Sequence, residues 1–132
     1  MPLKFILTIG VCLMIGSIAQ AKDIIIKTSW EYNTTIKGIA SFYTIKSSGR
    51  ITANGEKYDE NLLTCAFNDA PFNSFLKVTN LANGKWIYCR INDRGGFEKY
   101  NHIIDLTPEG FSRIADLKEG IIYVQVEILK GE

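Results

Sequence analysis

The chain has 132 residues, of which 46% are hydrophobic and 22% are charged, so it is long enough to bury the core of one domain. Its 15 basic and 14 acidic residues give a formal net charge of +1. This balance excludes the basic surface of a nucleic-acid-binding protein and a polybasic membrane-binding patch, and we expect a monomer.

Residues 1–21 have the pattern of a secretory signal peptide. Lys4 precedes an apolar run from Phe5 to Ile18, and Ala19-Gln20-Ala21 has the small residues of a cleavage site. We therefore expect cleavage after Ala21, export to the periplasm, the cell envelope or the extracellular space, and no stable membrane anchor. An uncleaved anchor is the alternative, but the apolar run is short for a membrane span.

Most of the chain from residue 22 to residue 132 has the pattern of short β-strands. The candidate strands are apolar and β-branched, and they cover residues 23–32, 38–45, 75–81, 85–91, 102–106 and 121–129. In the segment 85–91, alternation places Ile87, Cys89 and Ile91 on one face, so Cys89 is expected to be buried. Asn83-Gly84 is a strong signal for a hairpin turn between the third and fourth of these segments.

One helix is predicted between residues 107 and 120. Thr107 is a suitable N-cap, Pro108 falls at the first helical position, and Gly120 ends the segment. A second short helix is predicted over residues 62–67. Many short strands with one or two helices are typical of a small closed β-barrel, so the chain is assigned to the mainly-β class.

Three acidic segments are candidates for chemistry. Glu56 and Asp59 follow the Asn54-Gly55 turn, and Asp93 lies at the end of a strand before Gly95-Gly96. Asp105, between two apolar residues, is expected to be half-buried and structural, paired with Arg94 or Arg50. For Glu56 and Asp59 the alternative is ordinary surface charge.

The cysteines leave two interpretations open. Cys65 and Cys89 remain after cleavage, and in an exported domain they either form a disulfide or are two separate buried thiols. No metal site and no cofactor are expected, because His102 is the only histidine and no CxxC spacing occurs. No Ser-His-Asp set, P-loop or GxGxxG motif is recognised either.

The chain resembles the RlpA-like (rare lipoprotein A) family over nearly all of residues 22–132. The resemblance rests on a long set of motifs in the family's order and spacing. They are Gly38-Ile39-Ala40-Ser41-Phe42-Tyr43, Thr52-Ala53-Asn54-Gly55-Glu56, Tyr58-Asp59, Val78-Thr79-Asn80-Leu81, Arg90-Ile91-Asn92-Asp93-Arg94-Gly95 and Ile103-Ile104-Asp105-Leu106.

The resemblance implies a six-stranded double-psi β-barrel with one or two short helices, acting on peptidoglycan. Active members resemble endolytic lytic transglycosylases, which cleave the MurNAc–GlcNAc bonds of denuded glycan strands. The product is a 1,6-anhydro sugar, because a hydroxyl of the substrate itself attacks in place of water. One carboxyl group can serve as the acid and then the base of such a reaction.

Site residues are transferred from the family motifs one by one. Asp93 is the expected acid/base, while Glu56 and Asp59 are expected to bind or polarise the sugar. The substrate-binding residues implied by the same motifs are Tyr43, Asn54, Tyr58, Asn92 and Arg94.

One departure keeps other functions open. The family's motif Thr-Ala-Ala-His corresponds to Thr64-Cys65-Ala66-Phe67, so its histidine is Phe67 in this chain. His102 is a weak substitute for that histidine. The alternative to an enzyme is therefore a non-catalytic, expansin-like module that binds glycan, and a weaker third option is a barrel that binds or inhibits a partner protein.

Overall fold

A computed structural model describes residues 31–43, 49–97 and 99–130. The predicted signal peptide, residues 1–21, and most of the predicted strand 23–32 lie outside the described residues. Within the described ranges, no helix has the length and apolar character needed to cross a membrane.

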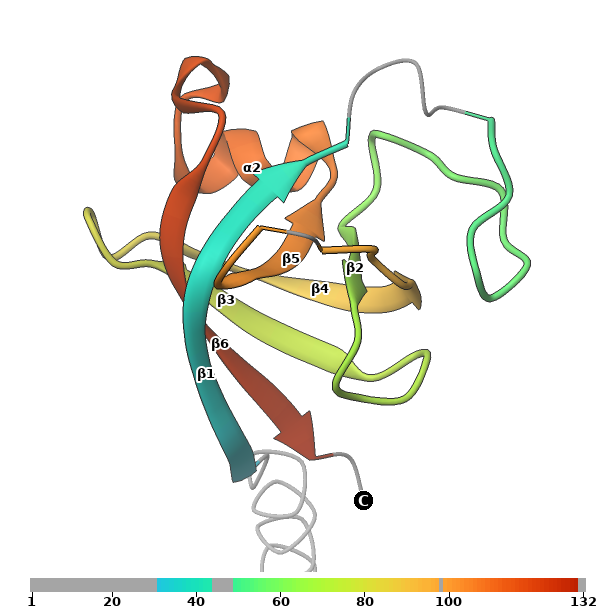
Figure 1. The fold of residues 1–132 in the computed structure, drawn as a ribbon, viewed down its shortest axis with the longest axis horizontal. Helices are drawn as coiled ribbons and strands as arrows, with labels where there is room; N and C mark the ends of the chain where they lie inside the picture. Colours follow the sequence, from blue (N-terminus) through green and yellow to red (C-terminus); the bar gives the residue numbers. More distant parts are fainter. Residues whose placement is uncertain (1–30, 44–48, 98, 131–132) are drawn as a thin grey trace, which may run out of the picture. The chain divides into compact units, whose positions relative to one another are not determined.

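Six strands form a closed barrel in the order β1-β5-β2-β4-β3-β6 (Figure 1). Two pairs, β1 with β5 and β2 with β4, are parallel, and the other pairs are antiparallel. The strands are β1 (Glu31–Phe42), β2 (Thr64–Phe67), β3 (Phe75–Asn80), β4 (Trp86–Asp93), β5 (His102–Leu106) and β6 (Ile122–Lys130). The predicted closed six-stranded barrel is confirmed.

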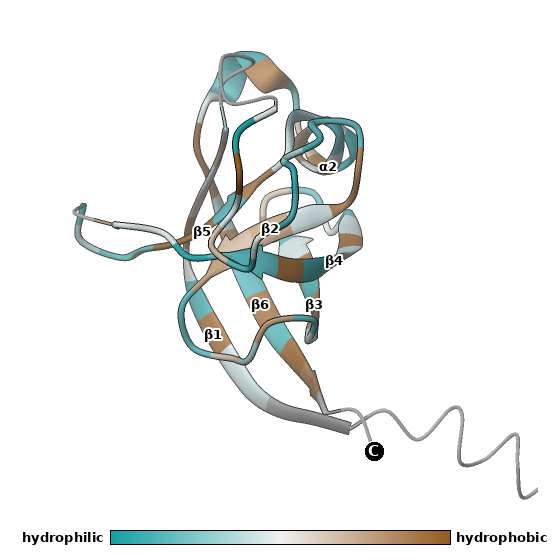
Figure 2. Cartoon of the chain, turned by 90° about the vertical axis from the view of Figure 1, so that its right-hand side faces the viewer, coloured by the Kyte–Doolittle hydropathy of each residue, from teal (hydrophilic) through white to brown (hydrophobic). Residues whose placement is uncertain are grey.

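In β4 and β6, alternation of apolar and polar residues sets which face of the strand is buried. The side chains of Ile87, Cys89 and Ile91 are buried as predicted, and Val124 and Val126 of β6 are fully buried. Alternating hydrophilic and hydrophobic bands are visible along β6 in Figure 2. The predicted hairpin joins β3 to β4, and Gly84 supplies the positive φ of 77° that its turn requires.

The predicted helix starts as expected but ends early. In α2 (Pro108–Ile114) the Thr107 hydroxyl accepts a hydrogen bond from the Gly110 amide, and proline occupies the first turn. The helix stops at Ile114, and a separate 3-10 turn, η2 (Leu117–Glu119), precedes Gly120. Asp116 caps η2 through the Lys118 amide, and this second cap separates the two elements.

Two sequence predictions about the first half of the chain were wrong. Residues 62–67 do not form a helix, because Thr64–Phe67 is the strand β2, paired with both β4 and β5. All four residues of β2 are buried, so pairing with two neighbours outweighs the weak helical preference of the segment. The predicted strands 23–32 and 38–45 are not separate where they are described, since β1 runs continuously from Glu31 to Phe42.

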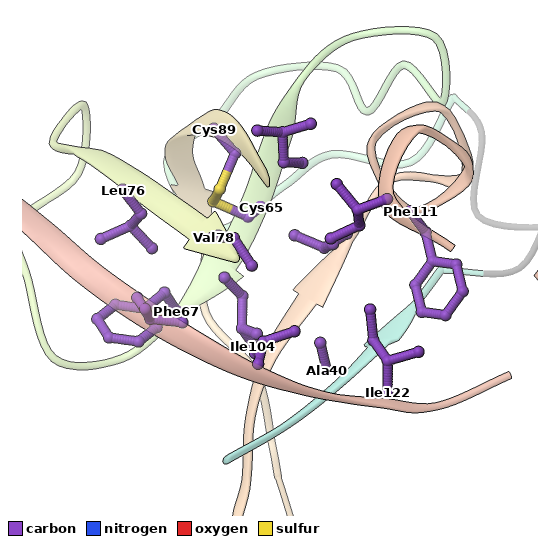
Figure 3. Packing of buried hydrophobic residues seen from close by; sticks show 14 of the residues in the cluster. Ala40, Cys65, Phe67, Leu76, Val78, Cys89, Ile104, Phe111 and Ile122 are labelled. Carbon is purple, nitrogen blue, oxygen red and sulfur yellow. A yellow bond between two sulfur atoms is a disulfide. The ribbon is translucent and has the colours of Figure 1, made fainter. Parts of the chain in front are cut away.

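A disulfide lies in the core. Cys65 of β2 is joined to Cys89 of β4, which decides between the two interpretations of the cysteines (Figure 3). Phe67 also belongs to this core, and its side chain is 0% exposed. The position that corresponds to the family's histidine therefore carries a core residue in this chain.

Gly38 of β1 is required by a close backbone contact. A Cβ at this position would lie 2.6 Å from the carbonyl oxygen of Asn101 and 2.8 Å from the Ile103 side chain. We expect Gly38→Ala to lower the free energy of unfolding by about 1–3 kcal/mol, because overpacking displaces the backbone. Urea denaturation would measure this change. Gly96→Ala, where a Cβ meets nothing within 4 Å, is the control, and equal stability of the two variants would contradict the prediction.

Candidate functional site

The strand register places two carboxylates in one row across the barrel wall. Ala66 of β2 is opposite Asp93 of β4 on one side and Asp105 of β5 on the other. Asp105 is in turn opposite Ser41 of β1. Since neighbouring strands are about 4.8 Å apart, the Cα atoms of the two aspartates are separated by about 10 Å.

An irregularity in the β2–β4 pairing brings Asp93 into this row. Cys65 is paired with Ile91, but the next residue, Ala66, is paired with Asp93 rather than Asn92. A β-bulge re-aims the side chains that follow it, because the extra residue shifts the alternation by one. The bulge therefore puts the Asp93 side chain on the same face as that of Asp105.

Three hydrogen bonds hold the Asp93 carboxylate. The Tyr43 hydroxyl donates to Oδ2 at 2.6 Å, and the backbone amides of Ala53 and Arg94 each donate to Oδ1 at 2.9 Å. Burial and the hydrogen bond to Asp93 raise the pKa of Tyr43, so its hydroxyl keeps its proton. A hydroxyl both donates and accepts, whereas an amide only donates. A proton on Asp93 would therefore be carried by Oδ2, where Tyr43 remains a partner in either protonation state.

The loop before β2 supplies the Ala53 amide. The loop folds back on itself through the Ile51–Lys57 bridge and through the Thr52 amide, which donates to the Glu56 carbonyl at 2.7 Å. Gly55 takes a φ of 92° in the turn, which a side chain would disfavour. Figure 1 shows this loop in green beside β2. Its turn geometry thus aims a backbone donor at Asp93.

Glu56 anchors the same loop to β4. Arg90 donates to both carboxylate oxygens of Glu56, at 2.7 and 2.9 Å. Asn92 and Asn54 donate through their side-chain amides at 3.2 and 3.0 Å. The Arg90 hydrogen bonds, followed by those of Asn92 and Asn54, lower the pKa of Glu56 to about 2. Glu56 is therefore a fixed anion that positions the loop, which does not suit a group that exchanges a proton.

This ion pair predicts a pH-dependent contribution to stability. The pKa of Glu56 is below its usual 4.5 in the folded chain, so the contribution is complete above about pH 4.5. It is lost as the pH falls from 4.5 through the pKa of about 2, at which half of the carboxylate is protonated. We expect wild type to be more stable than Glu56→Gln at pH 6 and this difference to be mostly lost near pH 2, as measured by thermal melting.

Glu109→Gln is the matched control for this pH series. Glu109 pairs with Arg113 on an exposed face of α2, and exposed pairs contribute little. The assigned role of the Glu56–Arg90 ion pair would be contradicted if the difference in melting temperature between wild type and Glu56→Gln did not change with pH. It would also be contradicted if Glu109→Gln showed the same pH-dependent difference.

The structure places the other predicted site residues in different roles. Asp59 is exposed, and its carboxylate accepts from the Asn61 amide at 2.9 Å, as in a capped turn. Tyr58 is only 4% exposed, and its ring packs against that of Tyr43. Arg94 donates to the Phe67 carbonyl at 2.7 Å and stacks on the Phe72 ring.

Three of the predicted substrate-binding residues are buried or engaged inside the protein. Tyr58 and Asn92 are buried, and their contact with substrate stays a prediction. Asn54 is engaged with Glu56 and Thr52 inside the loop. The structure brings the predicted site residues together in two groups, Tyr43 with Asp93 and Tyr58, and Glu56 with Asn54 and Asn92.

A second polar cluster surrounds Asp105. Its Oδ1 accepts from the Ser41 hydroxyl and lies 2.8 Å from Nε2 of His102, which is 3.2 Å from Ser41 Oγ. The prediction that Asp105 is half-buried and paired is confirmed, but the predicted arginine partner was wrong. Serine, histidine and aspartate are the residue types of a hydrolase triad, in which the serine and the carboxylate contact opposite ring nitrogens of the histidine. Here the same nitrogen of His102, Nε2, faces both partners, so the cluster does not have the geometry of a triad.

Sequence reasoning missed this cluster. Ser41 and Asp105 are 64 residues apart, and only the parallel pairing of β1 with β5 joins them. The sequence contained one signal for the cluster, which is that His102 lies three residues before Asp105. An irregular strand can bring two side chains at this spacing together. The cluster lines a cavity of about 420 Å³ together with Phe97, Lys99 and Ile121.

Comparisons with known proteins agree on the family. A family model described as lytic transglycolase matches residues 35–126. An endolytic peptidoglycan transglycosylase RlpA from Pasteurella multocida is 46% identical over 93 residues, covering 70% of this chain and 31% of the relative. The protein of the same name from Campylobacter jejuni is 43% identical over 95 residues, covering 72% of this chain and 34% of the relative. This chain thus spans about a third of these relatives.

Solved structures share the fold at low identity. The Streptomyces papain inhibitor is 19% identical with a TM-score of 0.62, covering 77% of this chain and 100% of the inhibitor. An expansin from Clavibacter michiganensis, solved with cellohexaose, is 19% identical with a TM-score of 0.60, covering 75% of this chain and 52% of the expansin. The barrel is a double-psi β-barrel, as the family match and these neighbours indicate.

Proposed function

The chain belongs to the RlpA-like lytic transglycolase family, and we propose that it is an endolytic peptidoglycan transglycosylase. It would cleave MurNAc–GlcNAc bonds of denuded glycan strands and leave 1,6-anhydro ends. The relatives named for this activity support the proposal. In the structure, it is carried by one observation: Asp93 is held on both oxygens, with Oδ2 next to a hydroxyl that stays protonated.

The geometry suits a single carboxyl group that acts twice. Protonated Oδ2 of Asp93 would give its proton to the glycosidic oxygen as the bond from that oxygen to C1 breaks. The C6 hydroxyl of the same sugar then attacks C1, and Asp93 takes up its proton. Protons and bonds balance without water, and Asp93 ends the cycle protonated again. Tyr43 would keep Oδ2 oriented throughout, because its hydroxyl pairs with either form.

We propose supporting roles for the other residues. Glu56, with Arg90 and Asn92, would hold the loop that delivers the Ala53 amide. Asp59 and Arg94 would lie at the edges of the bound strand. The exposed position of Asp59 and the Phe72 contact of Arg94 are compatible with this placement.

The setting of the reaction is part of the same proposal. We propose that residues 1–21 direct export and are removed, and that residues 22–132 act as a monomer on the peptidoglycan of the cell envelope. The relatives are named for peptidoglycan, which supports this setting. Neither a nucleic acid nor a cofactor is required by this chemistry.

Product analysis tests the proposal. Denuded peptidoglycan strands would be incubated with the exported protein, residues 22–132, and the products would be analysed by mass spectrometry. We expect fragments with 1,6-anhydro ends. Fragments heavier by one water molecule would show hydrolysis, and an absence of both cleavage and binding would contradict the proposal.

One observation favours a second candidate, a barrel that binds glycan without cutting it. The family's histidine position is Phe67, and its side chain is fully enclosed in the core. That position offers no group for proton transfer. Retention of intact strands by the protein, with no product in the same incubation, would favour this candidate.

A further inference from the structure

The residues that line the cavity beside Asp105 take no part in the proton transfers proposed at Asp93. Its volume of about 420 Å³ lies in the range of small-ligand sites. The polar residues Ser41, His102 and Asp105 are part of its lining. Gly96 also lines it, three residues after Asp93, so the cavity adjoins the row that contains the proposed acid/base.

One acceptor in this cavity is available to a ligand. Asp105 uses Oδ1 for both Ser41 and His102. Within residues 31–43, 49–97 and 99–130, its Oδ2 accepts no hydrogen bond that the structure shows, and 22% of the side chain is exposed. A carboxylate oxygen in this state is suited to a neutral N–H donor. It disfavours an anionic group at the same place.

The rest of the lining combines a donor with apolar walls. Lys99 carries a cationic donor on an exposed side chain at the cavity. Ile39 and Ile121 line the cavity with Phe97, whose ring packs on His102 with centroids 4.5 Å apart. Ile121 is 54% exposed, so its side chain is available to an apolar group of a ligand.

We propose that this cavity binds the acetamido group of an N-acetylated amino sugar, next to the sugar whose bond is cut at Asp93. The inference rests on the proposed function and names a subsite for it. The acetamido N–H would donate to Oδ2 of Asp105, its carbonyl would accept from Lys99, and its methyl group would contact Ile39, Phe97 and Ile121. A sugar with a hydroxyl in place of the acetamido group has no methyl group to contact these apolar side chains.

The separation of the two aspartates supports neighbouring subsites. Asp93 and Asp105 lie on the two strands that flank β2, opposite Ala66 from either side and about 10 Å apart at Cα. Tyr43 connects the two aspartates, because its hydroxyl donates to Asp93 and its backbone amide donates at 3.0 Å to the carbonyl of Leu106, the residue after Asp105. One glycan strand can therefore reach both carboxylates.

Calorimetric titration of the exported protein with three hexasaccharides tests the subsite. They are the β-1,4-linked hexamers of N-acetylglucosamine, glucosamine and glucose, titrated at high salt so that attraction of the glucosamine ammonium groups to Asp105 is screened. We expect the N-acetylated hexamer to bind at least about 10-fold more tightly than the other two. We expect Ile121→Ala to remove most of this preference, because a methyl contact in an apolar pocket is worth about 10-fold or more.

Leu117→Ala is the matched control, since Leu117 is 41% exposed and does not line the cavity. It should leave all three affinities unchanged, while Asp105→Asn should lower the affinity for the N-acetylated hexamer alone. Equal affinities for the three hexamers, or equal losses for all of them in Ile121→Ala, would overturn the subsite. Formation of anhydro products is measured separately, so the proposed function survives that result. A protein that neither binds nor cuts N-acetylated strands overturns both.

Discussion

Asp93→Asn is expected to lower the rate of glycan cleavage by about 100- to 10,000-fold, the usual contribution of a general acid and base. Asparagine has nearly the same shape as aspartate, but it cannot give a proton to the glycosidic oxygen or take one from the C6 hydroxyl. The single side-chain oxygen of asparagine could also accept hydrogen bonds either from Tyr43 or from the Ala53 and Arg94 amides, which donate to Oδ1 in the wild type, but not from all three. Rates of anhydro-product formation from denuded strands measure the effect.

Two further variants separate chemistry from folding at this site. Asp116→Asn makes the same change at an exposed cap of η2, where asparagine caps equally well, and it should leave the rate unchanged. Tyr43→Phe removes only the hydroxyl partner of Oδ2, so we expect a smaller loss than for Asp93→Asn. Wild-type rates in a folded Asp93→Asn protein would exclude Asp93 as the acid/base.

Removing the disulfide is expected to have the largest effect on stability. Cys65 and Cys89 are separated by 24 positions, and closing a loop of this length stabilises a fold by about 3 kcal/mol. For a domain of this size, that loss lowers the melting temperature by roughly 12–24 °C. Melting of a Cys65→Ala, Cys89→Ala double variant measures the change.

Reduction provides the control for the double variant. Wild type that is unfolded, reduced and refolded in a thiol reductant should melt close to the double variant, and the variant should not respond to the reductant. The remaining difference reports the small voids left where the two sulfur atoms were buried. Identical melting of oxidised and reduced wild type would show that the bond does not contribute to stability.

The sequence by itself determined the elements whose signals are local. The alternation in β4 and β6, the Asn83-Gly84 turn and the Thr107 cap were all predicted and are present. Each of these elements depends on residues within a few positions of one another, so a short stretch of sequence is enough to predict it. The long set of ordered motifs also determined the family and the closed barrel.

Only the tertiary structure decided which side chains meet. The segment 62–67 became a strand because β4 and β5 pair with it on both sides. Glu56 became a fixed anion because Arg90, 34 positions away, binds both of its oxygens. Asp105 pairs with Ser41 because β1 lies beside β5, and with His102 of its own strand because β5 is irregular there, and not with an arginine. These partners depend on strand order and on bulges, which combine segments far apart in the chain, and no local pattern records them.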